Sequence, residues 1–316
     1  MEPIKTDRLE LVDGEGNTRA LLSVDDQGKV SIALGDGDGR LRARLAVGED
    51  GAAGLELRGT DGQMRAFLGA AASDDEASSL ELLDSDGASR ASIGAWADGS
   101  SSVHVSGPGG SRRLVLGTTA DGDSGLDILD ADGAHRLSVS HNMAGPTGIM
   151  VWDPKGVLRA LFAHGPEPDR SASVEFWDPT GAYRAGYGHW PNGATGAELL
   201  DGSGTLRARL GERADGGTSV ELTDPNGKFR AGIGEWANGS SGVELWDGND
   251  INRARLGVWE DGTSGLEISD PRGDNRARLG QRPDDSSTLD FWDRDGNYSF
   301  GVGEGPSTSG GKAANG

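Results

Sequence analysis

The sequence of 316 residues contains no cysteine, so it has neither a disulfide framework nor a cysteine-based metal site. Long apolar runs are also missing. No stretch approaches the roughly 20 residues that a membrane-spanning helix needs, and residues 1–16 hold no apolar signal core. We therefore expect no membrane insertion. The compartment stays open between the cytoplasm and a virion or fibre component.

Positive charge is scarce as well. The chain has 30 Lys and Arg but 51 Asp and Glu, which gives a formal net charge of −21 at pH 7. A surface of this sign repels nucleic acid and anionic membranes, so we expect neither as a partner. The same charge helps to keep many strands soluble and apart.

The abundant features are glycine, with 54 residues, and a repeat with a fixed period. Thirteen repeats are spaced by 23 residues, except for two of 25. The repeats begin at Leu9, Ile32, Leu55, Leu80, Val103, Leu126, Ile149, Val174, Ala197, Val220, Val243, Leu266 and Leu289. With each first residue counted as position zero, Asp occupies position four in eleven repeats, and Arg occupies position ten in all but the last, which has Ser299. Glycine fills position seven everywhere except at Asp250.

The apolar positions of the repeat indicate β-strands. Positions zero, two and thirteen are apolar in every repeat, and position eleven is Ala, Leu or Phe. A spacing of two is typical of strands and does not fit a helix. The Asp-x-x-Gly segment at positions four to seven supplies turn chemistry, as does the Asn-Gly or Asp-Gly near position eighteen, for example at 238–239. The sequence thus predicts an all-β chain of twenty-six strands.

The turn chemistry also suggests a strand register. If positions three and eight close a four-residue loop, paired positions sum to eleven, so position one faces position ten. Position one is acidic in ten repeats, as at Glu221, and position ten is Arg, as at Arg230. This register predicts a cross-strand acid–Arg pair in most hairpins, each worth roughly 0.2–1 kcal/mol.

Three architectures fit tandem 23-residue β-hairpins with one apolar face, which some other layer must cover. They are an elongated antiparallel repeat sheet, a β-solenoid and, as an alternative, a β-propeller. No linker divides the array. We expect a lead-in over residues 1–8, a single array over 9–303 and a flexible tail over 304–316, where strand periodicity is absent.

All eight tryptophans lie at positions three and sixteen of the repeat, on the face that carries the acids and arginines. One interpretation is structural, with each indole covering a glycine or an arginine. The other is a row of aromatic platforms for a glycan or a protein partner. The candidate residues of this face are Trp152, Trp177, Trp190, Trp236, Trp246, Trp259 and Trp292.

Segments such as 234–242 (GEWANGSSG) and 257–265 (GVWEDGTSG) resemble the Gly-x-Trp-x-Asn/Asp-Gly core of membrane occupation and recognition nexus (MORN) repeats. The Tyr that precedes this core in the family is Gly232 and Arg255 here. The Asp-x-x-Gly-x-x-Arg-x-x-Leu-Gly hairpin also resembles repeats of bacteriophage tail-fibre-like proteins. Both resemblances imply scaffold or fibre roles built on stacked β-hairpins.

Catalytic chemistry finds little support in the sequence. The five histidines are scattered over variable positions, and neither H-E-x-x-H nor G-x-S-x-G is present. Acid pairs recur in every repeat, whereas catalysis needs one distinct site. Outside the pattern, only the two long loops gather such groups, at Asp74-Asp75-Glu76 and at His164, Glu167 and Asp169. We expect no enzyme, no catalytic residue, no cofactor and no metal site.

Calcium is the alternative kept for the acidic turns. GDGDG (35–39), DSDG (84–87), DADG (130–133) and DRDG (293–296) resemble the start of a calcium loop, but the downstream Glu of an EF-hand is missing. Plain turn chemistry is favoured over weak calcium binding.

These observations favour a non-enzymatic scaffold or fibre-like protein that assembles or interacts through its repeats. The expected partner is a protein, which includes a second copy of the chain. The alternative is a lectin-like protein that binds glycans through its tryptophans.

Overall fold

The computed structural model describes residues 5–71, 77–165, 171–281 and 286–303. The expected tail and the acidic groups of the two long loops (Asp74, Asp75, Glu76, Glu167 and Asp169) lie outside these ranges. The chain divides into an N-terminal half, Met1–Leu158, and a C-terminal half, Arg159–Gly316, and each is described by itself. The prediction of a single array over 9–303 concerns how the halves join and stays a prediction.

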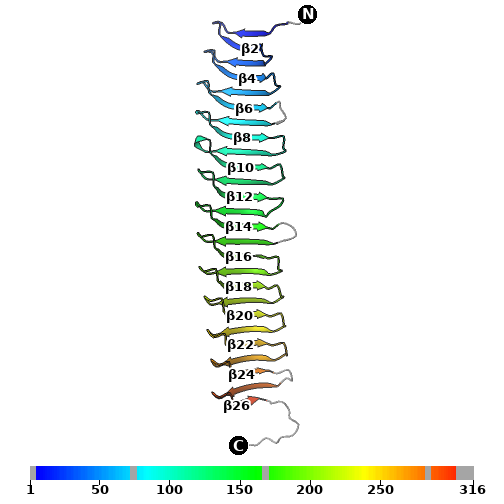
Figure 1. The fold of residues 1–316 in the computed structure, drawn as a ribbon, viewed down its shortest axis with the longest axis vertical. Helices are drawn as coiled ribbons and strands as arrows, with labels where there is room; N and C mark the ends of the chain where they lie inside the picture. The colour runs from blue at the N-terminus through cyan, green and yellow to red at the C-terminus, as the bar shows by residue number, and fades with distance from the viewer. Residues whose placement is uncertain (1–4, 72–76, 166–170, 282–285, 304–316) are drawn as a thin grey trace. The chain divides into compact units, whose positions relative to one another are not determined.

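The N-terminal half is an all-β sheet (Figure 1). Its strands are β1 (Arg8–Val12), β2 (Thr18–Val24), β3 (Val30–Gly35), β4 (Leu41–Val47), β5 (Ala53–Arg58), β6 (Met64–Ala70), β7 (Ser78–Leu83), β8 (Ser89–Ala95), β9 (Ser101–Ser106), β10 (Arg112–Thr118), β11 (Ser124–Leu129), β12 (His135–His141) and β13 (Thr147–Trp152). One 3-10 turn, η1 (Pro108–Gly110), stands between β9 and β10.

The C-terminal half repeats the same plan. Its strands are β14 (Leu158–His164), β15 (Ala172–Trp177), β16 (Tyr183–His189), β17 (Thr195–Leu200), β18 (Leu206–Glu212), β19 (Thr218–Thr223), β20 (Phe229–Glu235), β21 (Ser241–Trp246), β22 (Asn252–Val258), β23 (Ser264–Ser269), β24 (Asn275–Gln281), β25 (Ser287–Trp292) and β26 (Tyr298–Gly303). The described residues therefore contain the twenty-six strands that the sequence predicts.

Within each half, every strand pairs antiparallel with its neighbours in sequence, as β19 does with β18 and β20. This is the hairpin array, one of the three arrangements that the sequence allowed. A solenoid would stack parallel strands from successive rungs, and a propeller would close four-stranded blades; the described pairings show neither.

In the eleven repeats that have Asp at position four, the first turn forms because this carboxylate satisfies backbone donors that no strand can reach. In the tenth repeat, the Asp224 N–H donates to the Lys228 carbonyl (2.9 Å), and the Gly227 N–H donates to the Asp224 carbonyl (2.9 Å). Oδ1 of Asp224 accepts from the N–H groups of Asn226 (2.8 Å) and Lys228 (3.1 Å). The loop therefore has five residues, positions four to eight.

This five-residue loop makes the predicted register wrong. Val220 pairs with Ile233, Glu221 with Gly232 and Leu222 with Ala231, so paired positions sum to thirteen instead of eleven. The register also shifts between Leu222 and Thr223, because position ten is an extra residue that bulges out of the ladder. Position one therefore faces position twelve, and the arginine at position ten does not face the acid at position one.

Acid–Arg pairs across strands do occur, but with arginines at position twelve. Arg209 lies opposite Glu198 and donates to its carboxylate at 2.7 Å. Arg255 lies opposite Glu267 and donates to it through Nε at 2.5 Å. Cross-strand pairing of acid and arginine thus supports the register, as the sequence suggests, but the arginine stands at position twelve and not at position ten.

The arginine at position ten joins successive repeats. Arg230 donates to the Asp224 carboxylate of its own turn and to the Asp247 carbonyl of the next turn. Equivalent bonds run from Nε of Arg207 to the Thr223 carbonyl (3.1 Å) and from Nε of Arg253 to the Ser269 carbonyl (2.9 Å). We call this arrangement the arginine clamp. It explains why the repeat requires arginine at a bulged position.

Position seven requires a left-handed backbone. Gly227 has φ +79°, and Asp250, which replaces glycine in the eleventh repeat, has φ +61°. Asp250 is the one residue other than glycine with positive φ among those described. Residues with a Cβ are strained there by about 1–2 kcal/mol, and Asp somewhat less.

We expect Asp250→Gly to raise the free energy of unfolding by up to about 1 kcal/mol, because it removes this strain. Gly227→Ala should lower it by about 1 kcal/mol for the same reason. Urea denaturation followed by circular dichroism measures both changes. Equal signs for the two variants would show that backbone strain does not govern this position.

Candidate interaction surfaces

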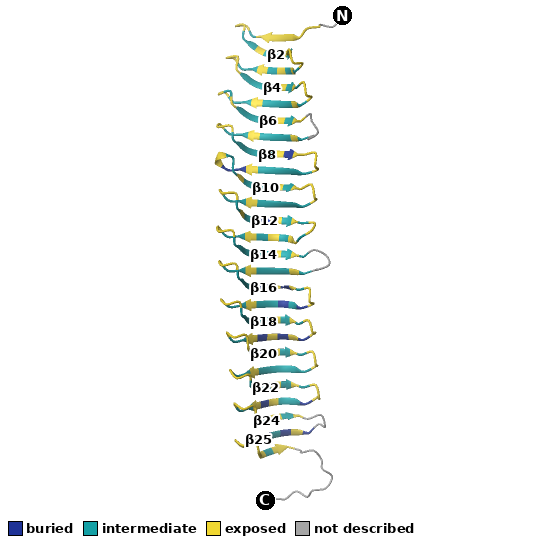
Figure 2. Cartoon of the chain, in the orientation of Figure 1, coloured by how far each residue is buried: buried dark blue, intermediate teal, exposed yellow. Residues whose placement is uncertain are grey.

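The apolar face of the sheet is uncovered in both halves. Every side chain at positions two and thirteen of the thirteen repeats is exposed, from 37% at Val151 to 63% at Tyr187. Ala194 is the only apolar side chain in the buried core of the described residues, and Figure 2 shows buried residues as short stretches only. The expected covering layer is therefore not supplied within either half.

The opposite face is polar and more enclosed. Glu221 (6% exposed) and Glu267 (5%) are buried there. Arg213 donates to Glu221, and Arg255 and Arg278 both pair with Glu267. We call this surface the polar face. Long arginine side chains lie across it and shield the carboxylates from water.

Seven of the eight tryptophans, those expected to form a partner face, are half-buried. Trp177 packs edge-on against Tyr183 (6.1 Å between ring centroids), and Trp292 packs against Tyr298 in the same way (6.4 Å). Trp152 lies 5.7 Å from the His135 ring. Trp190 begins a turn in which its N–H donates to the Ala194 carbonyl. Among the described residues of the C-terminal half, Trp177, Trp190 and Trp292 make no ring contact with one another.

Three of the predicted residues do share hollows of the polar face. Trp236 and Trp259 line one of about 300 Å³, and Trp236 and Trp246 line another of about 380 Å³. Arg255 stacks over the Trp259 ring at 4.8 Å, and Trp246 Nε1 donates to Glu244 at 3.1 Å. These contacts occupy much of the two rings.

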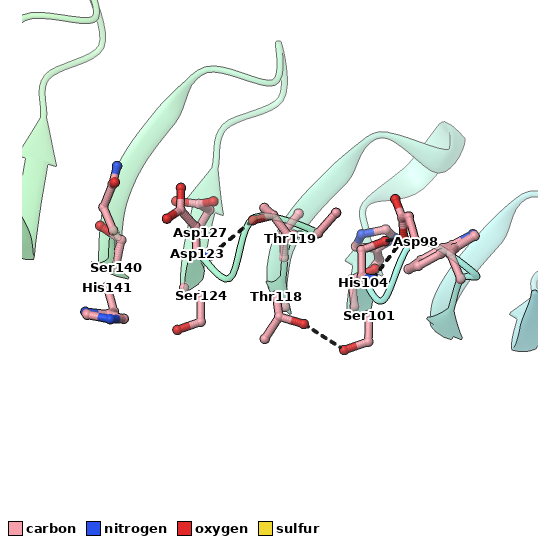
Figure 3. Close-up of a pocket in the computed structure, with 18 of the residues that line it drawn as sticks. Asp98, Ser101, His104, Thr118, Thr119, Asp123, Ser124, Asp127, Ser140 and His141 are labelled. Atoms are coloured by element: carbon pink, nitrogen blue, oxygen red, sulfur yellow. Dashed lines mark hydrogen bonds between the residues drawn. The ribbon is translucent and has the colours of Figure 1, made fainter. Parts of the chain in front are cut away.

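The eighth tryptophan, Trp96, is the most exposed at 42% and is not among the candidate residues of the predicted partner face. It lines a larger hollow, of about 680 Å³, on the polar face of β9–β12 (Figure 3). At position sixteen, the next two repeats have Thr119 and Asn142, which also line this hollow. Tryptophan occupies position sixteen in four of the thirteen repeats, and Trp96 is the one followed by two consecutive small residues, which is the sequence signal that could have identified the hollow.

The floor of this hollow departs from the repeat as well. His104 stands at position one, where most repeats have an acid, and Asp127 follows at the same position of the next repeat. Burial, together with the Arg112 cation, lowers the pKa of His104, so the imidazole is neutral at pH 7. Asp127 contacts His135 (Oδ1 to Nδ1, 3.3 Å). The lining is thus rich in hydroxyl, carboxylate and imidazole groups.

The acidic turns use their carboxylates internally. Oδ1 of Asp130 accepts from the N–H groups of Asp132 (2.9 Å) and Ala134 (2.9 Å), while Oδ2 pairs with Arg136. Residues 5–71, 77–165, 171–281 and 286–303 hold no group of three His, Asp or Glu arranged for a metal ion. Plain turn chemistry stays the prediction at these turns, and weak calcium binding stays the alternative.

Within the same ranges, the structure has no helix of the length and apolar character needed to cross a bilayer. No family model and no curated protein matches the chain. Among solved structures, crystal structures of TcdB2-TccC3-Cdc42 (11% identity, TM-score 0.15) and TcdB2-TccC3-TEV (10%, 0.16) are similar over 88% and 91% of this chain and 22% of each matched chain. The chain thus spans about a fifth of their length, and TM-scores this low carry no argument.

Proposed function

We propose that the protein is a non-enzymatic scaffold or fibre component that assembles by pairing its apolar face with that of a second copy. The observation that carries this proposal is the exposure of every side chain at positions two and thirteen. Soluble monomers rarely expose continuous apolar surface beyond a few hundred Å². A face of this kind is typical of a protein that associates.

The number of exposed apolar side chains decides whether association is favourable. Fully burying a Leu, Ile or Val contributes roughly 1.5–3 kcal/mol, so covering one that is half exposed, such as Leu245 (49%) or Leu256 (56%), contributes about 1 kcal/mol. Association costs on the order of 4–15 kcal/mol. The exposed residues at positions two and thirteen of one half suffice to offset that cost.

A second copy is the occupant that the pattern favours. Rows zero, two, eleven and thirteen hold no charged residue in any repeat, while the acids of position one occupy the polar face. Two apolar faces can therefore meet while these acids point away from the contact. A copy also has the same spacing of apolar rows along every strand, which an unrelated partner would have to reproduce. Sheets packed in this way lie about 10 Å apart.

The test is the solution mass of the full chain by light scattering, with small-angle scattering, over a concentration series. The variant Leu210→Lys/Leu256→Lys changes two residues of the C-terminal half. Each is 56% exposed, so this half should still fold. We expect the wild type to associate and the double variant to associate at least 100-fold more weakly, because two buried charges oppose the contact. Circular dichroism checks that the variant keeps its strands.

The matched control is Asn226→Lys/Asn249→Lys, which adds the same charge at exposed turns. It should associate like the wild type. A wild type that stays monomeric up to about 100 μM, or a double variant that associates as strongly as the wild type, would overturn the proposal.

A further inference from the structure

The hollow beside Trp96 brings an aromatic ring together with several polar side chains. In the N-terminal half it is lined by an exposed indole, by three carboxylates and by a row of hydroxyl groups. Most of the lining lies on the polar face, so pairing of the apolar faces would leave it open. What binds there is thus a separate question from how the protein assembles.

One wall of the hollow is an aromatic platform. A Cβ built on Gly94 would lie 2.9 Å from the Trp96 ring, so the indole packs over this glycine. With 42% of its surface exposed, Trp96 still presents ring surface that a ligand can contact. No aromatic or cationic partner of this ring is found in the described residues, unlike the ring of Trp259, over which Arg255 stacks.

The other walls supply hydrogen-bonding groups. Oδ1 of Asp98 accepts from the Ser100 N–H (2.8 Å), and Oδ1 of Asp123 accepts from the Met143 N–H (2.7 Å). These bonds hold both carboxylates in place and leave Oδ2 of each to accept another bond. Figure 3 shows these two carboxylates above the strands, with His104 and Asp127 beside them. Planar carboxylates next to a flat indole suit a ligand with many hydroxyl groups.

The hollow extends along three successive turns. Where consecutive repeats both have tryptophan at position sixteen, at Trp236 and Trp259, the hollow between them measures about 300 Å³. Where Trp96 is followed by Thr119 and Asn142, the hollow continues past both smaller residues and measures about 680 Å³. This volume is within the range of small-ligand sites.

We propose that this hollow binds a neutral oligosaccharide, with one sugar ring stacked on Trp96 and its hydroxyl groups donating to Asp98 and Asp123. A neutral ligand is favoured over an acidic one because three carboxylates line the hollow, with Arg112 as its one permanent cation. The glycan site thus lies at Trp96 and not at the seven half-buried tryptophans of the predicted partner face.

The full chain is titrated with cellohexaose, maltohexaose, xylohexaose and mannohexaose. Binding is measured by calorimetry and by tryptophan fluorescence. We expect at least one to bind, and Trp96→Ala to weaken its binding at least tenfold through loss of the platform. Trp190→Ala, which changes the same repeat position in the C-terminal half, should leave the affinity unchanged.

A second variant tests the hollow without removing any platform. Thr119→Trp inserts the residue that other repeats have at this position, so we expect it to fold, to keep Trp96 and to abolish binding by filling the space. Circular dichroism and scattering mass show whether each variant keeps its fold and assembly. Failure of all four oligosaccharides to bind, or equal affinity in wild type, Trp96→Ala and Thr119→Trp, would overturn the proposal and leave the assembly function untouched.

Discussion

Replacing Gly211 with alanine should lower the free energy of unfolding by about 3 kcal/mol. Gly211 lies at the end of β18, directly opposite Gly196 of β17. A Cβ built there would lie 2.0 Å from the Thr195 carbonyl oxygen and 2.5 Å from the Gly196 Cα, and φ is +150°. Backbone cannot yield to this contact as a flexible side chain could, so the two strands must separate.

The control is Gly202→Ala, in the turn between the same two strands. A Cβ there meets nothing within 4 Å, and its φ is not positive. Urea denaturation should show a change within about 0.5 kcal/mol for this variant. Amide hydrogen exchange should show the loss of protection for Gly211→Ala centred on β17–β19, because stability in repeat arrays is set between neighbours. Equal stability of the two variants would contradict the close approach at Gly211.

Replacing Arg230 with methionine should lower the free energy of unfolding by about 2 kcal/mol, because the arginine clamp joins the turns of two repeats. Its guanidinium donates to the Asp224 carboxylate and to the Asp247 carbonyl, and the side chain is 22% exposed. Methionine keeps the aliphatic packing and removes both bonds. The stability of Arg230→Lys should lie between those of the wild type and Arg230→Met, because one ammonium lacks the planar fork that reaches both acceptors.

The matched control is Arg294→Met. The Arg294 side chain is 93% exposed and pairs weakly with Asp295 (3.5 Å). It should unfold like the wild type. A cost for Arg294→Met as large as that for Arg230→Met would show that net charge, and not the clamp, is responsible.

Acid should weaken the same clamp. Desolvation is the largest single influence on Asp224 and raises its pKa, but the backbone donors of Lys228 and Asn226, together with Arg230, outweigh it and place the pKa below its ordinary value. A lowered folded-state pKa contributes stability above the unfolded-state value near 4, and this contribution is lost as the pH falls further. Arg230→Met should therefore lose less stability than the wild type between neutral pH and acid.

The local structure follows from the sequence alone. Period-two apolar positions, the Asp-x-x-Gly turn and the Asn-Gly or Asp-Gly turn each depend on neighbouring residues, and they predict the all-β class and the strand number. The choice of the hairpin array over a solenoid or a propeller came from the strand pairings. The residues at position seven follow in the same way, since the φ that Gly227 and Asp250 share belongs to the turn itself.

The register needed the tertiary structure, because Asp224 Oδ1 reaches two backbone donors and widens the loop to five residues. The resulting bulge turns Arg230 from a cross-strand partner of Glu221 into a clamp on the next repeat. A loop of four residues would pair position one with position ten. The backbone path of the turn decides whether position one pairs with position ten or with position twelve.

The tertiary structure also decided which surfaces are open. Alternation places Leu222 and Ile233 on one face, but whether another layer covers that face depends on segments far away in sequence or on another molecule. The hollow at Trp96 likewise depends on side chains from consecutive hairpins, because Trp96, Thr119 and Asn142 line it from three successive turns of the sheet. A repeat pattern fixes what each position does on average, whereas a site arises where neighbouring repeats depart from it together.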